Sequence, residues 1–350
     1  MERMSETVER LCSDELAGRR PGTPGGAAAA RFVESRFAAI GLEPAGEDGY
    51  RQPIGRIGGT NLLGAVPGGR PGWVLLAAHF DHLGARAGKV YRGANDNAAG
   101  VAVLLEVAAA LAGRGRRDAR SVLICSFDAE EPPFFLGPTM GSQWFVDHPT
   151  IPVGEIDLMI CLDLVGTALG PPGIPAEVRE SIFVQGAETS TGTAALLDGL
   201  PTVAGIRPRH LPDWIIEPMS DQYAFRSARI PWVFYTVGRD ARYHQPTDTP
   251  EHLDGRKMAA LAIHLVHLVE AAATSRGRRR YLDEPAGDDA AIASLRAVLR
   301  PLAVLDPTAG AALEMLDRIA PSLDGGRLPA DARNAVRAIV LGLEASLAGL

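Results

Sequence analysis

The sequence is poor in cysteine, lacks a basic excess and contains no long uninterrupted apolar run. Three cysteines among 350 residues exclude a disulfide framework, so we expect buried, reduced thiols in a cytoplasmic protein. A net charge of −7 provides no positive field, so we expect neither nucleic acid nor an anionic membrane as a partner. The charged N-terminus and the longest apolar stretch, which carries two histidines and a glutamate, predict neither a signal peptide nor a membrane span.

Apolar, strand-like runs alternate with helix-like segments along most of the chain. The expected strands cover 73–81, 121–130, 156–165, 181–188 and 230–238, and the expected helices cover 4–17, 25–41, 98–112, 191–200, 220–228 and 255–274. Strands this apolar are buried on both faces, as in a parallel sheet covered by helices. We therefore predict an α/β fold, a three-layer α/β/α sandwich with a mostly parallel mixed central sheet.

The composition changes near residue 276. The arginine-rich run 276–280 is typical of an exposed linker, and helical patterns follow near 288–304, 308–321 and 329–349. This tail carries no cluster of residues suited to chemistry. We predict a main, catalytic domain over 1–275 and a linker with a helical C-terminal extension over 276–350, which is the expected surface for any homo-oligomer.

Histidines and acids collect where the expected strands end. They are His79, Asp81, Glu130, Glu131, Asp163 and His244. In sheets of this kind the ligand site lies beyond the carboxyl ends of the strands. Imidazole nitrogens together with carboxylate oxygens suit a borderline metal such as zinc. Each residue alone is explained as a surface or capping group, so the metal hypothesis depends on the combination.

The stretch GANDNAAG, residues 93–100, places one acid between two amides. Asp96 taken alone is most simply the N-cap of the helix expected at 98–112. Glu130 and Glu131 are neighbouring like charges, which in a dry pocket repel unless a cation neutralises at least one of them. A metal beside this pair of acids would explain it.

The stretch AHFDH brings two histidines and an aspartate close together. His79 and Asp81 lie two residues apart on an extended segment and are expected to face the same side. Asp81 can then support a metal-binding histidine from behind. His82 is expected to face away.

These motifs together resemble those of a known family. AHFDHLG, GANDNAAG, FDAEE, CLDLVG, SDQYAF with IPWVFYTVG, and YHQPTDT follow one another as in the co-catalytic di-zinc aminopeptidases, the family-28 metallopeptidases. That superfamily includes bacterial leucyl aminopeptidases, glutamate carboxypeptidase II and glutaminyl cyclases. The resemblance covers roughly residues 8–270.

The resemblance implies a ligand set for two zinc ions, with cobalt or manganese as alternatives. Asp96 would bridge both ions. His79 and Asp163 would complete the shell of one ion, and Glu131 and His244 the shell of the other.

The resemblance also implies an activity. Glu130 would be the general base, with Asp81 and Asp248 supporting the site. The expected reaction is hydrolysis of the first peptide bond of a peptide or aminoacyl amide with a free N-terminus. Carboxypeptidase-like or dipeptidase-like hydrolysis, glutaminyl cyclisation with one zinc, and a catalytically inactive binding module are the alternatives.

Several departures from the family pattern leave the substrate open. Phe134 and Phe135 follow the paired glutamates and either wall the substrate pocket or pack in the core. Arg239 and Arg242 either form ordinary salt bridges or clamp a substrate carboxylate, which would favour a carboxypeptidase or dipeptidase. A domain that is often inserted before the strand that carries the first metal ligand is absent. Access to the active site is therefore either more open or closed by the C-terminal tail.

Overall fold

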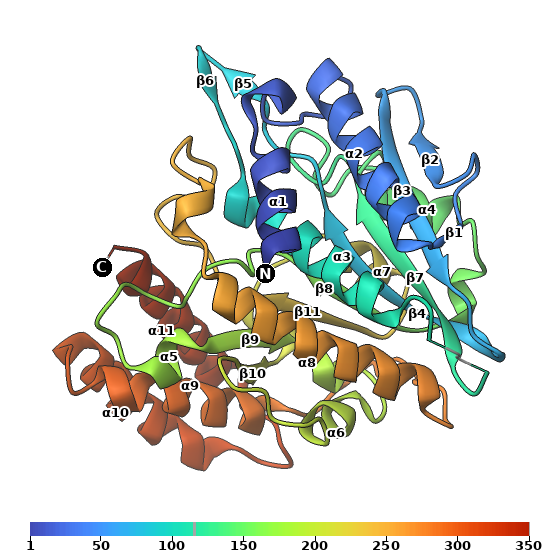
Figure 1. The fold of residues 1–350 in the computed structure, drawn as a ribbon. Helices are drawn as coiled ribbons and strands as arrows, with labels where there is room; N and C mark the ends of the chain where they lie inside the picture. The colour runs from blue at the N-terminus through green and yellow to red at the C-terminus, as the bar shows by residue number, and fades with distance from the viewer. Residues whose placement is uncertain (115–116, 350) are drawn as a thin grey trace.

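The computed structural model of the protein describes residues 1–114 and 117–349 (Figure 1). At its centre is a mixed sheet with the strand order β1-β3-β7-β4-β8-β11-β9-β10, and β2 pairs with β3. The strands are β1 (Glu43–Pro44), β2 (Arg51–Ile54), β3 (Gly59–Val66), β4 (Arg70–His79), β7 (Arg120–Phe127), β8 (Ile156–Leu162), β9 (Ser181–Gln185), β10 (Arg207–Leu211) and β11 (Trp232–Thr236). A small hairpin, β5 (Ala85–Arg86) and β6 (Lys89–Val90), stands apart.

Helices cover both faces of this sheet. They are α1 (Glu2–Leu11), α2 (Pro24–Ile40), α3 (Ala99–Leu111), α4 (Gly141–Asp147), α5 (Ala176–Arg179), α6 (Thr193–Asp198), α7 (Gln222–Ser227), α8 (Gly255–Thr274), α9 (Asp288–Leu302), α10 (Pro307–Ile319) and α11 (Ala330–Gly349). Figure 1 shows α3 and α8 crossing in front of the sheet, where they contact β4, and α7 packs against β8 and β11 on the other face. The predicted three-layer sandwich is therefore confirmed.

The central strand β4 shows why the sheet is buried on both faces. Val74 and Leu76 point to the core beneath α3 and α8, whereas Leu75 and Ala77 point to the core beneath α4 and α7. All four side chains are fully buried. The two-residue period of a strand thus divides one apolar run between two helix layers.

Local sequence signals set the ends of the long helices. Thr23 caps α2 by accepting a hydrogen bond from the Gly26 N–H at 3.1 Å, and Gly41 ends the helix in the left-handed conformation. Asp254 caps α8 through the N–H groups of Arg256 and Lys257.

The C-terminal extension packs directly onto the main domain. Helix α9 contacts β10 and α5, and α11 contacts the turn Asp213–Ile215. Apolar residues of the extension, such as Leu295 and Val336, belong to the same core as the helices over the sheet. In Figure 1 these helices lie beside β9 and β10.

The expectation that the arginine-rich run is exposed is wrong for one residue. Arg279 is buried, and its backbone N–H donates a hydrogen bond to Asp157 at 2.7 Å while its guanidinium pairs with the same carboxylate. Asp157 belongs to the central strand β8 and needs a buried cation as its partner. Arg279 therefore ties the extension to the sheet, whereas the other four residues of the run are exposed as expected.

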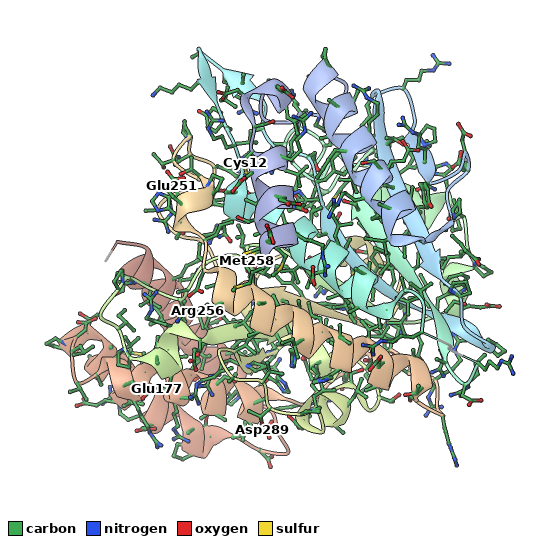
Figure 2. All side chains as sticks on the ribbon, in the orientation of Figure 1. Cys12, Glu177, Glu251, Arg256, Met258 and Asp289 are labelled. Carbon is green, nitrogen blue, oxygen red and sulfur yellow. The ribbon has the colours of Figure 1, made fainter. Side chains whose placement is uncertain are left out.

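Apolar segments and thiols lie inside the fold. Cys12, just after α1 (Figure 2), is buried, as are Cys125 and Cys161, and all three are free thiols as expected. Two segments, Ala94–Leu111 and Gly255–Thr274, are long and apolar enough to cross a bilayer. Most of their residues are buried inside the protein, as in core helices.

Candidate active site

Neighbouring parallel strands bring the predicted site residues to one edge of the sheet. Strands β7, β4, β8 and β11 lie side by side and run in the same direction. His79 is the last residue of β4, Glu130 and Glu131 follow β7, Asp163 follows β8, and His244 lies in the loop after β11. The carboxyl ends of these strands therefore form the site, as the sequence indicated.

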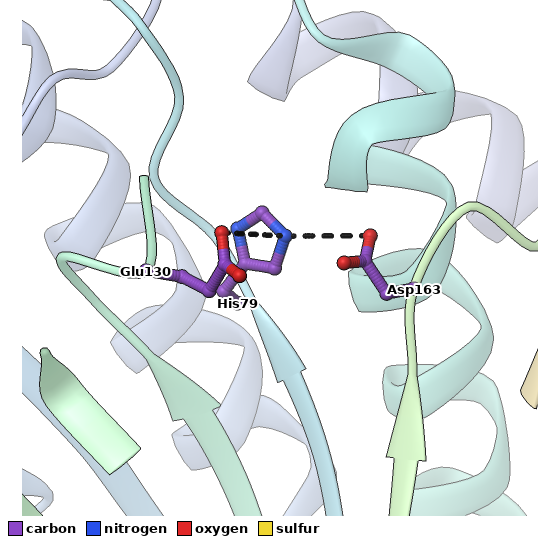
Figure 3. A group of neighbouring side chains, drawn as sticks. All are labelled: His79, Glu130 and Asp163. Carbon is purple, nitrogen blue, oxygen red and sulfur yellow. Dashed lines mark ion pairs between the residues drawn. The ribbon is translucent and has the colours of Figure 1, made fainter. Parts of the chain in front are cut away.

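A first cluster forms around His79. Its Nε2 atom lies 3.4 Å from Asp163 Oδ1 and 3.8 Å from Glu130 Oε2. Figure 3 shows the two acids on opposite sides of the imidazole, coming from the loops after β7 and β8. All three side chains are buried.

A second cluster shares Asp96 with the first. His244 Nε2 lies 3.0 Å from Glu131 Oε2 and 3.3 Å from Asp96 Oδ2. The other oxygen of Asp96, Oδ1, lies 3.5 Å from His79 Nε2. Asp96 therefore presents one oxygen to each cluster, and all five predicted metal ligands converge.

The N-cap explanation for Asp96 is wrong. Helix α3 begins after Ala98, and the side chain that accepts an N–H of its first turn is that of Asn97, which binds the Gly100 N–H at 3.2 Å. Asp96 itself lies in the irregular turn Ala94–Ala98 with non-helical backbone angles. Its carboxylate faces the two histidines and not the helix N–H groups.

The geometry of the clusters fits divalent metal ions. Ligands about 2.0–2.1 Å from a tetrahedral zinc ion lie about 3.3 Å from one another, and the shared-acid contacts span 3.3–3.5 Å. Among the described residues, both ring nitrogens of His79, Asp96 Oδ2 and Asp163 Oδ1 are buried without a hydrogen-bond partner. Buried polar atoms of this kind need a partner. A cation would supply it for His79 Nε2, Asp96 Oδ2 and Asp163 Oδ1, whereas His79 Nδ1 faces Asp81.

The electrostatics of the site also call for positive charge. Burial lowers the pKa of His244, but hydrogen bonds and charge from Asp96 and Glu131 outweigh it and raise the pKa to about 10. Burial raises the pKa of Glu130 well above its usual value, against the pull of the protonated His79 and with the help of Asp163. Because buried acids outnumber bases here, the site favours protonated side chains, and a bound cation would stabilise it in the same way.

The two amides around Asp96 hold its loop in place. Asn95 Oδ1 accepts a hydrogen bond from the Gly166 N–H at 2.8 Å, and Asn97 donates one to the last carbonyl of β8 at 2.8 Å. Asp248 accepts hydrogen bonds from the backbone N–H groups of Asn95 and Asp96, at 2.9 and 3.1 Å. The Asp96 carboxylate is thereby left free to face both clusters, and Asp248 lies where a supporting acid was predicted.

Asp81 lies behind both clusters. Its carboxylate accepts the backbone N–H groups of Glu130 and Glu131 at 3.1 and 3.2 Å. Its Oδ1 atom also lies 3.5 Å from His79 Nδ1. Asp81 can therefore orient His79 and the turn that carries both glutamates, and it makes these contacts without facing the space between the clusters.

The prediction that His82 faces away is wrong. Its side chain is buried, and its Nδ1 atom lies 2.6 Å from Glu131 Oε1. Strand β4 ends at His79, so the two-residue alternation does not extend to His82. A Cβ atom on Gly93 would lie 2.5 Å from the His82 ring, so the glycine makes room for this position. Burial would raise the pKa of Glu131, but His82 and His244 lower it.

Arg19 is a residue of the site region that sequence reasoning missed. It is fully buried and donates hydrogen bonds to the carbonyl oxygens of Phe80, Gly93 and Asp96 at 2.6, 2.6 and 3.2 Å. It also binds the carbonyls of Leu11 and Arg92. The only signal was its place in the N-terminal stretch GRRPGT, which periodicity marks as a loop. Arg19 joins that stretch to the loops after β4 and before α3.

The arginines and phenylalanines that were considered for contact with substrate have different surroundings in the structure. Arg239 pairs with Glu344 of α11 at 2.8 Å, and Arg242 pairs with Asp240 at 2.6 Å, so both form salt bridges within the chain. Phe134 and Phe135 are partly exposed.

Comparisons with known proteins agree with this fold. The uncharacterized protein YfbL of Escherichia coli K12 is 28% identical over 220 residues, a match that spans 56% of this chain and 66% of the relative's length. The LapA aminopeptidase of Legionella pneumophila has a similar structure, with a TM-score of 0.63, 17% identity, and coverage of 78% of this chain and 72% of LapA. A Zn-dependent exopeptidase of Parabacteroides distasonis matches with a TM-score of 0.58, 18% identity, and coverage of 77% and 97%.

The family assignment comes from a separate comparison. A model of peptidase family M28 matches residues 61–269, more than half of the chain, and this range contains every predicted metal ligand. The predicted resemblance to the family-28 metallopeptidases is thereby confirmed. The chain belongs to peptidase family M28.

Proposed function

We propose that this protein is a zinc-dependent aminopeptidase that uses two metal ions and Glu130 as its general base. The observation that carries the proposal is the sharing of Asp96, whose two oxygens face His79 and His244 at 3.5 and 3.3 Å. His79, Asp163 and Asp96 would hold one zinc ion, and Glu131, His244 and Asp96 the other. Two bound zinc ions would polarise the scissile carbonyl and lower the pKa of a water molecule between them.

Glu130 is placed to move the proton in this reaction. Its carboxylate lies in the first cluster, and its backbone N–H is fixed by Asp81. Glu130 accepts a proton from the attacking water as the carbon–oxygen bond forms. It then returns that proton to the leaving amine as the carbon–nitrogen bond breaks.

The acids of the site also favour a substrate with a free N-terminus. Three of the buried acids would be zinc ligands, and Glu130 is a further buried carboxylate beside them to which a protonated α-amine would be attracted. The arginines that would favour a carboxypeptidase are already paired within the chain. Peptides and aminoacyl amides with free N-termini are therefore the proposed substrates.

The test combines metal analysis with a panel of substrates. The purified chain is loaded with zinc, its metal content is measured, and aminoacyl anilides, N-acetylated anilides and peptides with N-terminal glutamine are assayed in parallel. Two zinc ions per chain and cleavage restricted to free amines would support the proposal. Equal cleavage of the N-acetylated substrates would contradict an aminopeptidase. One zinc ion with cyclisation of glutamine peptides would indicate the acyl-transfer alternative.

A further inference from the structure

An apolar pocket lies between the sheet and the C-terminal extension. Its volume is about 360 Å³, within the range of pockets that bind small molecules. Leu169, Phe183, Met219 and Val237 line it from the main domain. The lining on the side of the extension comes from α11 and from Leu295 of α9. An amino-acid side chain of large apolar type matches this space in size and polarity.

The lining of the pocket is hydrogen-bonded to the backbone next to Asp163 of the first metal cluster. Val237 donates its backbone N–H to the carbonyl of Leu164 at 2.9 Å, and Leu164 is the residue after Asp163. Met219 precedes Ser220, whose hydroxyl oxygen lies 3.8 Å from the thiol of Cys161 in β8, two residues before Asp163. The pocket lining is therefore tied to the backbone on both sides of a predicted zinc ligand.

Helix α11 presents one face to this pocket. Arg337, Val340, Glu344 and Leu347 all line it, at the spacing of three and four residues that places side chains on one helical face. Val340 and Leu347 supply apolar surface, and Leu347 is buried.

A salt bridge fixes this helix to the loop that carries His244. Glu344 accepts hydrogen bonds from Arg239 Nε and Nη2 at 2.9 and 2.8 Å, and also from the Arg239 backbone N–H at 3.1 Å. The Arg239 guanidinium lies 5.9 Å from the ring of Tyr243, which stacks on His244 with ring centres 3.9 Å apart. These contacts hold α11 against the site through a bidentate pair of charges.

We propose that α11 completes the substrate site by forming one wall of the pocket that receives the side chain of the substrate's first residue. The extension thereby confers a preference for bulky apolar residues at that position. This inference rests on the aminopeptidase activity proposed above. The family match ends at residue 269, so this wall lies outside the part of the chain that the family defines.

The test fills the pocket from the side of α11. Val340→Trp adds bulk on the pocket face, and Ala345→Trp adds the same bulk at an exposed position of the same helix. For each zinc-loaded full-length variant, kcat and KM are measured with alanyl, leucyl and phenylalanyl 4-nitroanilide. We expect Val340→Trp to lower kcat/KM for the leucyl and phenylalanyl substrates at least ~10-fold, mainly through KM, and for the alanyl substrate less than ~3-fold. Ala345→Trp should match the parent protein.

A second variant covers the case in which tryptophan disrupts folding. Leu341 lines the pocket but is 53% exposed, so Leu341→Glu should fold and place a charge at the pocket wall. It should shift the preference away from leucyl and phenylalanyl substrates in the same direction. If the parent protein cleaves these anilides but both folded variants keep its size preference, the assignment of α11 is overturned and the aminopeptidase proposal stands. If the parent protein cleaves none of them, the proposed function fails, and this inference fails with it.

Discussion

Replacing Arg19 tests whether the N-terminal stretch holds the metal loops together. Its guanidinium donates to five backbone carbonyls, among them Phe80, Gly93 and Asp96, and it is fully buried. In Arg19→Met those carbonyls lose a charged donor. Removing one partner from a buried charged network costs about 3–5 kcal/mol, because buried polar groups are left unpaired. With an unfolding entropy of about 2.1 cal/mol/K per residue, 1 kcal/mol corresponds to about 1.4 °C for a protein of this size, so the Tm should fall by roughly 4–7 °C.

The assay compares denaturant unfolding, Tm and bound zinc in three variants. Arg31→Met removes an exposed arginine of α2 and should change the free energy of unfolding by less than about 0.5 kcal/mol. Arg19→Lys keeps the charge but offers one nitrogen in place of three, so its stability should fall between those of the parent and Arg19→Met. Bound zinc should also fall in Arg19→Met, because the carbonyls of Gly93 and Asp96 are released. A loss below about 1 kcal/mol with normal zinc would refute the reasoning.

Four further outcomes are expected. Glu130→Gln should keep its zinc but lose at least ~10²-fold in kcat on leucyl anilide, and an unchanged kcat would mean that another group is the base. Asp96→Asn should bind less zinc in metal analysis, because its shared carboxylate faces both clusters; full occupancy would argue against bridging. His82→Phe removes the 2.6 Å contact to Glu131 and should weaken zinc binding more than kcat at saturating metal, as shown by zinc titration. Chelation of zinc that is present at about 1,000 times its Kd should lower the free energy of unfolding by about 4 kcal/mol and the Tm by roughly 6 °C, and added zinc should restore both.

The central strands and most helices could be predicted because their patterns are local. Helix α8 begins and ends at the residues that its pattern predicts, and β4 contains a continuous apolar run that starts at Trp73. Strand β10 was not predicted, because it is an edge strand with the polar sequence RPRHL. Its Pro208 has no N–H to donate, which an edge strand tolerates. The antiparallel pairing of β9 with β11 also has no local signal, since strand direction depends on the connections between strands.

The sequence predicts the position of those site residues that lie at the ends of strands. His79 and Asp163 lie at or just after the ends of β4 and β8, so the sheet brings them together. His82 lies three residues further on, where the chain is no longer extended, and its direction depends on the space left by Gly93. The pairing of Arg239 with Glu344 joins residues 105 positions apart and has no periodic signal at all.

The way Asp96 is held explains why this part of the site should exist before metal binds. Asp248 takes the backbone N–H groups of Asn95 and Asp96, and Arg19 takes the carbonyl of Asp96, so the loop is fixed from both sides by groups that do not face the clusters. Burial, together with the charges of Asp163 and Glu131, raises the pKa of Glu130, so holding these acids side by side in ionised form costs free energy. A bound zinc ion would relieve the repulsion among these acids. The surrounding fold therefore holds the loop in place, and a bound metal ion would offset the electrostatic repulsion among the acids.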